Sequence, residues 1–517
     1  MTSGQHSIQS GISLPHQLAK YLSLTCIDIT LLYLAFLMYI GNESLFALTI
    51  LVITSLGNYF FLSTKTYAHR YIFPAIVGMT IFILFPLLYT MGIAFTNYSG
   101  SNLKTYEQVT EQLKELTYID ESKPQYTFAL YQDNQQFQLS LTDNDTEELL
   151  FTQPFSLDES EKHLEAASRN TAIGDKAPFS AVVKNRNALK QITVSLPSGE
   201  QVTFFTLRKF ASLGQRYTQP NPEKLQDGQT GEIFQANFET GFYESATGER
   251  LIPGFTVGAG LDNFRRVVTD EGIRGPFFQI FLWTVAFAFL SVAFTFCVGV
   301  VLACLINWKD IKGSPVYRVL LILPYAVPAF ISILIFRGLF NQSFGEINML
   351  LDSLFGVAPN WFSDPWLARS MILIVNTWLG YPYMMILCLG MLQTLSDDLY
   401  EASAIEGSNF ITNFFTITLP QVFKPMIPLL IASFAFNFNN FVLIALLTEG
   451  NPDIIGATTP AGTTDLLVSY TYRIAFQSSN QDFALASAIA TLIFILVGIM
   501  AWAQLHFTGR KPGETRA

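Results

Sequence analysis

The composition of this 517-residue chain is that of a membrane protein. Half of the residues are apolar, only 14% are charged, and the mean hydropathy is +0.34. These values are too apolar for an ordinary soluble domain of this length. The formal net charge is −10, and we expect no nucleic acid among the partners.

Eight apolar segments are each long enough to cross about 30 Å of hydrocarbon as a helix that rises about 1.5 Å per residue. We therefore predict an α-helical polytopic protein with eight transmembrane helices. No defensible cleavage site follows the first segment, so we interpret it as a retained span and not as a signal peptide. The predicted spans are 21–40, 45–63, 72–95, 277–306, 316–340, 370–393, 425–447 and 482–505.

Basic residues in short loops set the orientation of a membrane protein, because they stay on the cytoplasmic side. With eight spans, ten basic residues of the short loops and terminal segments fall on one side, and the loops on the other face are poor in Lys and Arg. We therefore predict a multi-pass protein of the bacterial inner membrane with both termini in the cytoplasm. These residues are Lys20, Lys65, Arg70, Lys309, Lys312, Arg318, Lys424, Arg510, Lys511 and Arg516.

The composition changes sharply between residues 97 and 275. Residues 99–270 include 24 acidic and 16 basic residues, a balance of −8 that accounts for most of the net charge. Alternating apolar and polar residues at 126–131, 136–142 and 191–207 predict β-strands, the last being a hairpin that turns at 197–200. The orientation argument places this strand-rich soluble insertion in the periplasm.

The expected organisation has four parts. Residues 1–96 hold three transmembrane helices, 97–275 form the periplasmic insertion, 276–507 hold five further helices, and 508–517 form a cytoplasmic tail.

Patterns of catalytic, nucleotide or metal sites are largely missing from the sequence. It has no G-x-x-x-x-G-K-[ST] phosphate loop and no histidines at metal-ligand spacing. The cysteines all lie in predicted spans, where we interpret them as small buried apolar residues. We therefore expect a protein that is not an enzyme and holds no metal or other cofactor. The cysteines are Cys26, Cys297, Cys304 and Cys388.

The segment 427–447 carries polar groups at membrane depth, where they are costly unless they face a cavity or a partner helix. At about 100° per residue, Ser433, Phe436, Asn437 and Asn440 fall on one face of a continuous helix. Amides, a hydroxyl and an aromatic ring suit an uncharged polyhydroxylated ligand such as a sugar. The alternative is that these amides join helices, which is the interpretation we favour for Asn439.

Prolines interrupt two further spans beside a tyrosine. In 323–330, Tyr325 lies between Pro324 and Pro328, a spacing that predicts a kink. In 378–385, Gly380 and Pro382 predict a second interruption next to Tyr383. Exposed backbone at such breaks is tolerated only beside protein or a cavity, so the two tyrosines could line a cavity. The alternative is that both tyrosines contact neighbouring helices.

The segment 401–420 reads EASAIEGSNFITNFFTITLP and falls on the predicted cytoplasmic side. Asp397 and Asp398 favour a helix start, so we predict a helix over 397–406. Gly407 permits a sharp turn, and a second short helix is expected over 409–418, ended by Pro420. This coupling segment, 397–420, is suited to carry motion from a soluble partner.

The spacing E-A-(A/S)-x-x-x-G, then nine residues, then I-x-L-P resembles the signature loop of permease subunits in ABC importers. With the large insertion and the stretches 323–336, 341–348 and 432–444, the chain resembles the MalF-type permease family of maltose/maltodextrin importers. The coupling residues by this resemblance are Glu401, Ala402, Ser403, Gly407, Ile417, Leu419 and Pro420.

The resemblance also implies partners, a site and a mechanism of alternating access. The partners would be a MalG-like second permease, a homodimeric MalK-like ATPase that binds ATP and Mg²⁺, and a periplasmic maltose-binding protein. Ala329 stands where the family usually has serine, which removes a hydroxyl from the site, and Ser403 replaces alanine in a small-for-small change. The implied maltose or maltodextrin site comprises Tyr325, Leu379, Gly380, Tyr383, Ser433, Phe436, Asn437 and Asn440.

Two other functions remain open at this stage. The chain could be an ABC permease for another neutral oligosaccharide, which the sugar that stimulates ATP hydrolysis would reveal. A membrane-anchored periplasmic sensor belongs to a different class, and it predicts a cytoplasmic output domain that the short basic C-terminal stretch does not provide.

Overall fold

The computed structural model describes residues 14–41, 43–63, 65–119, 123–133, 136–157, 162–168, 172–308 and 311–508. Its contacts divide the chain into two compact units. One unit comprises Met1–Gly100 with Ala259–Ala517, and the other comprises Ser101–Gly258. The predicted tail residues 510, 511 and 516 and Lys309 lie outside the described residues.

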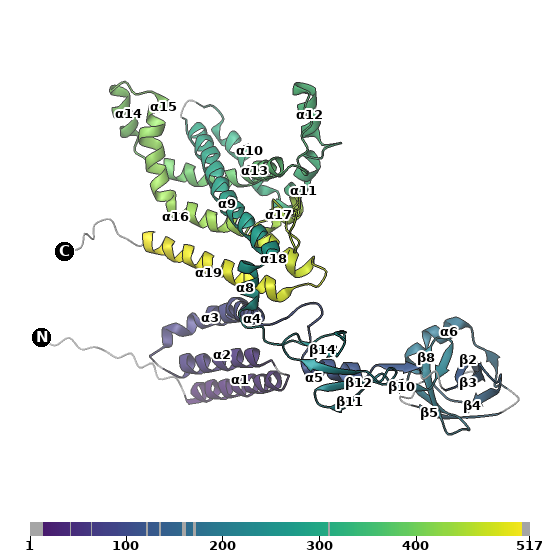
Figure 1. The fold of residues 1–517 in the computed structure, drawn as a ribbon. Coiled ribbons are helices and arrows are strands. Elements are labelled where there is room, and N and C mark those ends of the chain that lie inside the picture. The colour runs from purple at the N-terminus through teal and green to yellow at the C-terminus, as the bar shows by residue number, and fades with distance from the viewer. Residues whose placement is uncertain are drawn as a thin grey trace. The chain divides into compact units, whose positions relative to one another are not determined.

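The first unit begins with long apolar helices. Helices α1 (Leu14–Ile40) and α2 (Ser44–Leu62) lie side by side (Figure 1), joined by a hydrogen bond of 3.0 Å from Asn58 Nδ2 to Asp28 Oδ1. After the 3₁₀ helix η1 (Tyr67–Tyr71), a third span runs through α3 (Phe73–Met79), the π-helical η2 (Thr80–Leu84) and α4 (Phe85–Ile93). Proline lies in the first turn of α3 and in the first turn of α4.

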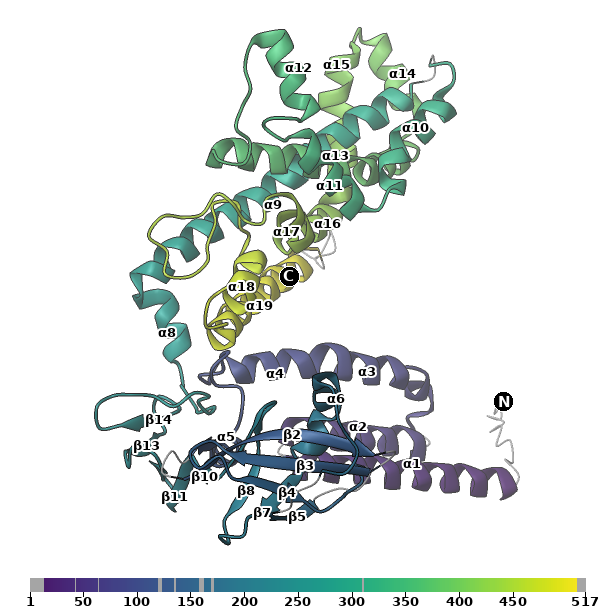
Figure 2. The same ribbon diagram turned by 90° about the vertical axis from the view of Figure 1, so that its right-hand side faces the viewer.

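The rest of this unit is a helical bundle around α9 (Glu271–Ile306), against which α13 (Pro365–Leu392) packs closely. The close packing of α9 and α13 depends on a glycine, because a Cβ on Gly299 would lie only 2.7 Å from the Cβ of Met384. Helices α18 and α19 lie side by side (Figure 2). The other helices are α8 (Asp262–Thr269), α10 (Ser314–Ala326), α11 (Ala329–Leu339), α12 (Glu346–Phe355), α14 (Asp397–Ile405), α15 (Phe410–Asn413), α16 (Leu419–Phe438), α17 (Phe441–Leu447), α18 (Leu467–Phe476) and α19 (Phe483–Thr508).

The prediction of eight spans is confirmed. In the described part of the chain, seven helices are long and apolar enough to cross a membrane. The eighth span is the pair α10 and α11, which is bent by 89°. The predicted kink at Pro324 to Pro328 is therefore correct, and its break falls between Ala326 and Ala329.

Three local predictions are wrong. The segment 427–447 is not one helix, because α16 ends at Phe438 and α17 begins at Phe441. Helix α13 continues through Gly380 and Pro382 without interruption. Pro420 does not end a helix but lies in the first turn of α16, directly after a π-helical turn. Between α15 and α16 the chain stays helical through the π-helical turn η3 (Phe414–Thr418).

The second unit is strand-rich, as predicted. In the described residues its larger sheet has eight strands in the order β3-β4-β5-β7-β8-β9-β2-β6, and its smaller sheets pair β11-β12-β13-β14 and β1-β10. The predicted hairpin over 191–207 forms, with Thr193 opposite Thr203 and Ser195 opposite Gln201. Separate apolar cores fill the larger sheet, around Leu139 and Phe210, and the four-stranded sheet, around Tyr243 and Phe255.

The strands are β1 (Thr117–Ile119), β2 (Gln125–Asp133), β3 (Gln136–Asp143), β4 (Leu149–Thr152), β5 (Lys162–Ala167), β6 (Asp175–Lys176), β7 (Ile192–Ser195), β8 (Gln201–Thr206), β9 (Lys209–Ala211), β10 (Leu213–Gln215), β11 (Tyr217–Asn221), β12 (Lys224–Asp227), β13 (Ile233–Asn237) and β14 (Phe242–Ser245). The helices of this unit are α5 (Tyr106–Lys114), α6 (Phe179–Lys184) and α7 (Arg186–Leu189).

Candidate functional site

The coupling segment folds as two short helices joined by a tight turn. Ser396 caps α14, with its hydroxyl accepting from the N–H of Asp398, and Asn409 caps α15 by accepting from the N–H of Thr412 at 2.8 Å. Between them Gly407 has φ of +80°, in the left-handed region that glycine enters without steric cost. The predicted helix, turn and helix are therefore present, with glycine at the turn.

Side-chain hydrogen bonds hold the two halves of this segment together. The hydroxyls of Ser403 and Ser408 both donate to Oδ1 of Asn413, and the Tyr400 and Thr418 hydroxyls lie 2.9 Å apart. Alanine at position 403 could not donate this hydrogen bond to Asn413, so Ser403 contributes a contact that the usual alanine lacks. These bonds hold the two halves of the segment together as one body.

The outward face of this body is available for contact. Five of the predicted coupling residues are Glu401, Ala402, Gly407, Ile417 and Leu419, of which the first three are exposed and the last two half-buried. Trp308, near the end of α9, stacks on Phe410 at the start of α15 with ring centroids 5.3 Å apart. The segment is therefore attached to the bundle at the same end as the α9 C-terminus.

Three amide side chains join α13 to the break between α16 and α17. Asn376 Nδ2 donates to Asn437 Oδ1 at 2.8 Å, and Asn440 Nδ2 donates to Asn376 Oδ1 at 3.2 Å. Asn437 also donates to the Ser433 carbonyl at 2.9 Å, while Asn440 Oδ1 caps α17 by accepting from the N–H of Leu443. Asn437 and Asn440 therefore join helices in this structure.

Asn439 behaves differently from the prediction that it joins helices. Its amide donates to the Ala435 carbonyl of its own helix, and the side chain is exposed. Asn376, by contrast, is central to the amide cluster and was missed by sequence reasoning. Its only sequence signal is an asparagine at mid-span, which does not by itself reveal a partner.

The aromatic members of the predicted site are the exposed ones. Tyr325 is 59% exposed, Tyr383 41% and Phe436 73%. These rings come from α10, α13 and α16. Helix α13 contacts α10, because the Tyr381 hydroxyl donates to the Leu321 carbonyl at 3.1 Å. Helix α13 also contacts α16 through the amide cluster. Uncovered rings on adjacent helices are available to a ligand or a second subunit.

The remaining predicted site residues face the bundle. Leu379 packs in the apolar cluster around Trp283 and Val375. Gly380 allows close helix packing, since a Cβ there would lie 2.7 Å from Cγ2 of Thr295. Ala329 is exposed at the first position of α11, directly after the bend.

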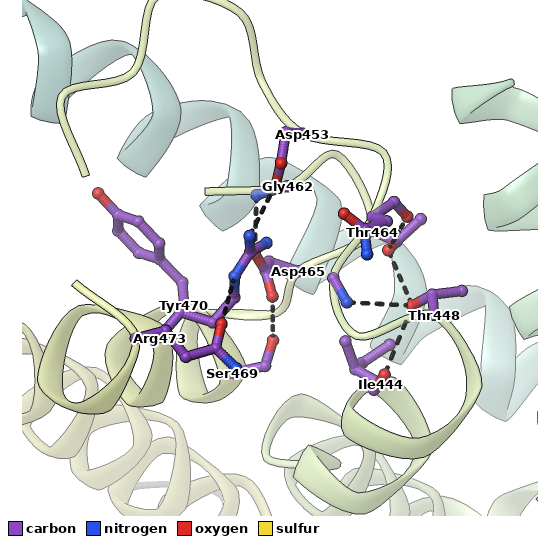
Figure 3. Close-up of polar contacts among 12 residues, drawn as sticks. Ile444, Thr448, Asp453, Gly462, Thr464, Asp465, Ser469, Tyr470 and Arg473 are labelled. Atoms are coloured by element: carbon purple, nitrogen blue, oxygen red, sulfur yellow. Dashed lines mark hydrogen bonds and ion pairs between the residues drawn. The ribbon is translucent and has the colours of Figure 1, made fainter. Parts of the chain in front are cut away.

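A buried ion pair that the sequence did not indicate organises the loop after α17 (Figure 3). Asp465 is fully buried and accepts from Arg473 Nη1 at 2.9 Å, from the N–H of Gly462 at 2.7 Å and from the Ser469 hydroxyl at 2.8 Å. Arg473 Nη2 also pairs with Asp453 at 2.7 Å. Burial raises the pKa of the Asp465 carboxyl, and the charge of Arg473 is the largest effect that opposes this rise.

Further hydrogen bonds attach this loop to the spans below it. The Thr464 carbonyl accepts from Trp283 Nε1 at 3.3 Å, and the N–H of Leu467 donates to the Thr284 hydroxyl at 3.1 Å. Gly450 has φ of +87°, and a Cβ there would lie 2.4 Å from a carboxyl oxygen of Asp465. Residues 448–473 thus form a rigid cap attached to α9. In the described residues no group of three or more His, Cys, Asp or Glu could hold a metal ion.

Comparison with known families assigns this architecture to a class. Residues 271–509 match the family "Binding-protein-dependent transport system inner membrane component". The chain is therefore a permease subunit of an ABC transporter, a class in which a separate subunit hydrolyses ATP. Residues 104–260 match "Maltose transport system permease protein MalF P2 domain", and residues 18–65 match "MalF, N-terminal region, transmembrane helices".

Full-length relatives identify the family more closely. The chain is 54% identical to the maltose/maltodextrin transport system permease protein MalF of Vibrio parahaemolyticus, with 92% of each chain covered. It is 54% identical to that of Vibrio cholerae, covering 95% of this chain and 94% of the relative. It is 52% identical to that of Salmonella typhimurium, covering 93% and 94%. The chain belongs to the MalF family.

Proposed function

We propose that this chain carries maltose and maltodextrins across the bacterial inner membrane, as one of two permease subunits that alternate between outward and inward access. Identity of 52–54% to maltose/maltodextrin permeases over more than nine-tenths of the chain is the observation that carries this substrate assignment. The exposed aromatic rings of the bundle agree with it, because rings pack on the apolar C–H faces of sugars.

The partners follow from the same family relationship. They are a MalG-like second permease, a homodimeric MalK-like ATPase that binds ATP and Mg²⁺, and a periplasmic maltose-binding protein. Both termini and the coupling segment 397–420 lie in the cytoplasm, and the insertion 97–275 lies in the periplasm. ATP binding closes the motor, and Glu401, Gly407 and their neighbours pass that closure to the spans.

The sugar site uses Tyr325, Tyr383 and Phe436 as direct contacts, since these side chains are uncovered in the single chain. The amides have a positioning role as well, because Asn376, Asn437 and the cap residue Asn440 hold α16 and α17 in place. The proposed sugar site also includes Ser433, Leu379 and Gly380. Ala329 has no hydroxyl, so it cannot make the contact that serine would make at this position.

Tyr325→Ala is expected to impair maltose uptake by the assembled transporter without loss of subunits. Asn437→Ala is expected to impair uptake too, and to lower the melting temperature as well, because it leaves buried Asn376 without an acceptor at a cost of about 1–3 kcal/mol. The measurements are sugar uptake and sugar-stimulated ATP hydrolysis in proteoliposomes, with subunit stoichiometry checked on a gel.

Tyr71→Ala is the matched control, since Tyr71 is also exposed but belongs to the segment between the second and third spans. Normal uptake by Tyr325→Ala contradicts the site assignment. Stimulation of ATP hydrolysis by a different oligosaccharide and not by maltose contradicts the substrate assignment.

A further inference from the structure

A buried hydroxyl group in the interior of α9 makes no hydrogen bond. Ser291 is fully buried, and within the described part of the chain its Oγ has no hydrogen-bond partner. The hydroxyl of Thr295, one turn further along, donates to the Ser291 carbonyl at 2.7 Å, as hydroxyls in helices commonly do. A buried hydroxyl without a partner is unfavourable, and folded proteins satisfy nearly all such groups. We therefore expect Ser291 to find its partner in another state of the transporter.

The packing of α9 against α13 shows which residue lies opposite Ser291. Three contacts along the two helices pair residues that are 85 or 86 positions apart, so the helices run parallel in a constant register. Residues four apart form one ridge of a helix, and Ser291 belongs to the ridge of α9 that makes these contacts. The same spacing leads from Ser291 to Asn376. The three contacts are those of Trp283 with Arg369, Thr295 with Gly380 and Gly299 with Met384.

Asn376 is 7% exposed and already joins α13 to two other helices. Its Nδ2 donates to Asn437 Oδ1 at 2.8 Å, and its Oδ1 accepts from Asn440 Nδ2 at 3.2 Å. Its amide carries a second N–H, which makes no hydrogen bond among the described residues. The two amides of the proposed sugar site are thus both engaged with Asn376.

Sugar binding by these amides would take the partners of Asn376 away. Asn437 is only 6% exposed, so a sugar hydroxyl reaches it only when the amide cluster opens. Asn376 would then remain buried between α9 and α13 with unpaired polar atoms, which opposes sugar binding. A substitute partner on α9 would remove this cost.

We propose that Ser291 is this substitute partner, and that its hydroxyl forms a hydrogen bond with Asn376 when sugar takes over Asn437 and Asn440. A hydroxyl both donates and accepts, so it fits either the nitrogen or the oxygen of the amide. The exchange keeps the buried polar groups paired in both states. Ser291 is then a positioning residue that touches no sugar. This inference rests on the proposed function, because it needs a sugar at the two amides.

The test uses the complete assembly with its binding protein, arrested with ATP and vanadate in the presence of radiolabelled maltose. The rate at which the retained maltose leaves is measured, and the sugar held by the binding protein alone is subtracted. Ser291→Ala should speed this loss roughly tenfold, or about 1.4 kcal/mol, because it leaves a buried amide unpaired. The melting temperature of this variant without sugar should not fall, because the hydroxyl has no partner in that state.

Three further variants separate this role from general effects. Ser291→Thr keeps a hydroxyl at the same position and should retain maltose as the wild type does. Thr491→Val is the matched control, since Thr491 is also a buried hydroxyl of a span but donates to the Ser487 carbonyl of its own helix, and it should not change retention. In an Asn376→Ala background, Ser291→Ala should have no further effect, because it acts through that amide.

Wild-type retention of maltose by Ser291→Ala overturns the inference and assigns the hydroxyl to a bond within α9. A lower melting temperature of the sugar-free Ser291→Ala assembly also overturns it, because Ser291 would then stabilise the resting state. So does an undiminished effect of Ser291→Ala in the Asn376→Ala background. If the wild-type assembly retains no maltose, the proposed function is wrong and this inference falls with it.

Discussion

Gly407→Val is expected to abolish maltose uptake while ATP hydrolysis either continues without transport or is lost with the motor subunit. The reason is backbone conformation, because Gly407 has φ of +80° and a β-branched residue is excluded from that region. The left-handed conformation costs about 1–2 kcal/mol for an ordinary L-residue, so the turn would relax and change the angle between α14 and α15. Uptake and ATP hydrolysis in proteoliposomes measure the effect.

Steric contact does not explain the expected defect, since a Cβ at Gly407 would meet nothing within 4 Å. Gly407→Asn should therefore keep most of the activity, because asparagine adopts the left-handed region more readily than other residues. Gly390→Val is a second control at a helical glycine with equally open surroundings. Coupled transport at the wild-type rate by Gly407→Val would show that the turn does not transmit motion.

Asp465→Ala is expected to be the most destabilising single change in the loop after α17. It leaves the Arg473 guanidinium largely buried without its fully buried partner, at a cost of about 3–5 kcal/mol. The N–H of Gly462 also loses its acceptor, and the Ser469 hydroxyl keeps only the Leu466 carbonyl. The melting temperature of the detergent-purified chain and protease protection of residues 448–473 measure the loss.

Asp453→Ala is the matched control, because Asp453 pairs with the same arginine but is 67% exposed. An exposed ion pair contributes about 0–1 kcal/mol, so this variant should melt close to the wild type. Equal destabilisation by the two variants would mean that burial of Asp465 is not what makes its ion pair important.

Local signals in the sequence predicted much of the fold. Runs of apolar residues predicted the spans, because a helix must be long enough to cross the hydrocarbon. Alternation predicted the strands of the insertion, and Pro324 with Pro328 predicted a kink, which the structure shows as a bend of 89°. Gly407 predicted the turn of the coupling segment, because only glycine enters the left-handed region freely.

The break after Phe438 could not be predicted in this way. Asn439 and Asn440 by themselves fit both a helix break and a polar face of one continuous helix. The Asn440 side chain caps α17 and bonds to Asn376 on α13, and this contact accompanies the break. That partner lies 64 residues away in sequence. The predicted polar face of 427–447 therefore assumed a continuous helix that tertiary contacts had interrupted.

The sequence by itself determined the spans, the strand-rich insertion and the helix, turn and helix of residues 397–420, because span length, strand alternation and turn chemistry are properties of neighbouring residues. The class of the protein followed from the resemblance of residues 401–420 to the signature loop of ABC permeases. Only the tertiary structure decided which polar side chains join helices and which remain uncovered. Asn437 is buried against α13 while Phe436 beside it is 73% exposed. The same holds for Asp465 and Arg473, whose buried pairing depends on how the loop folds against α9 and on no local pattern.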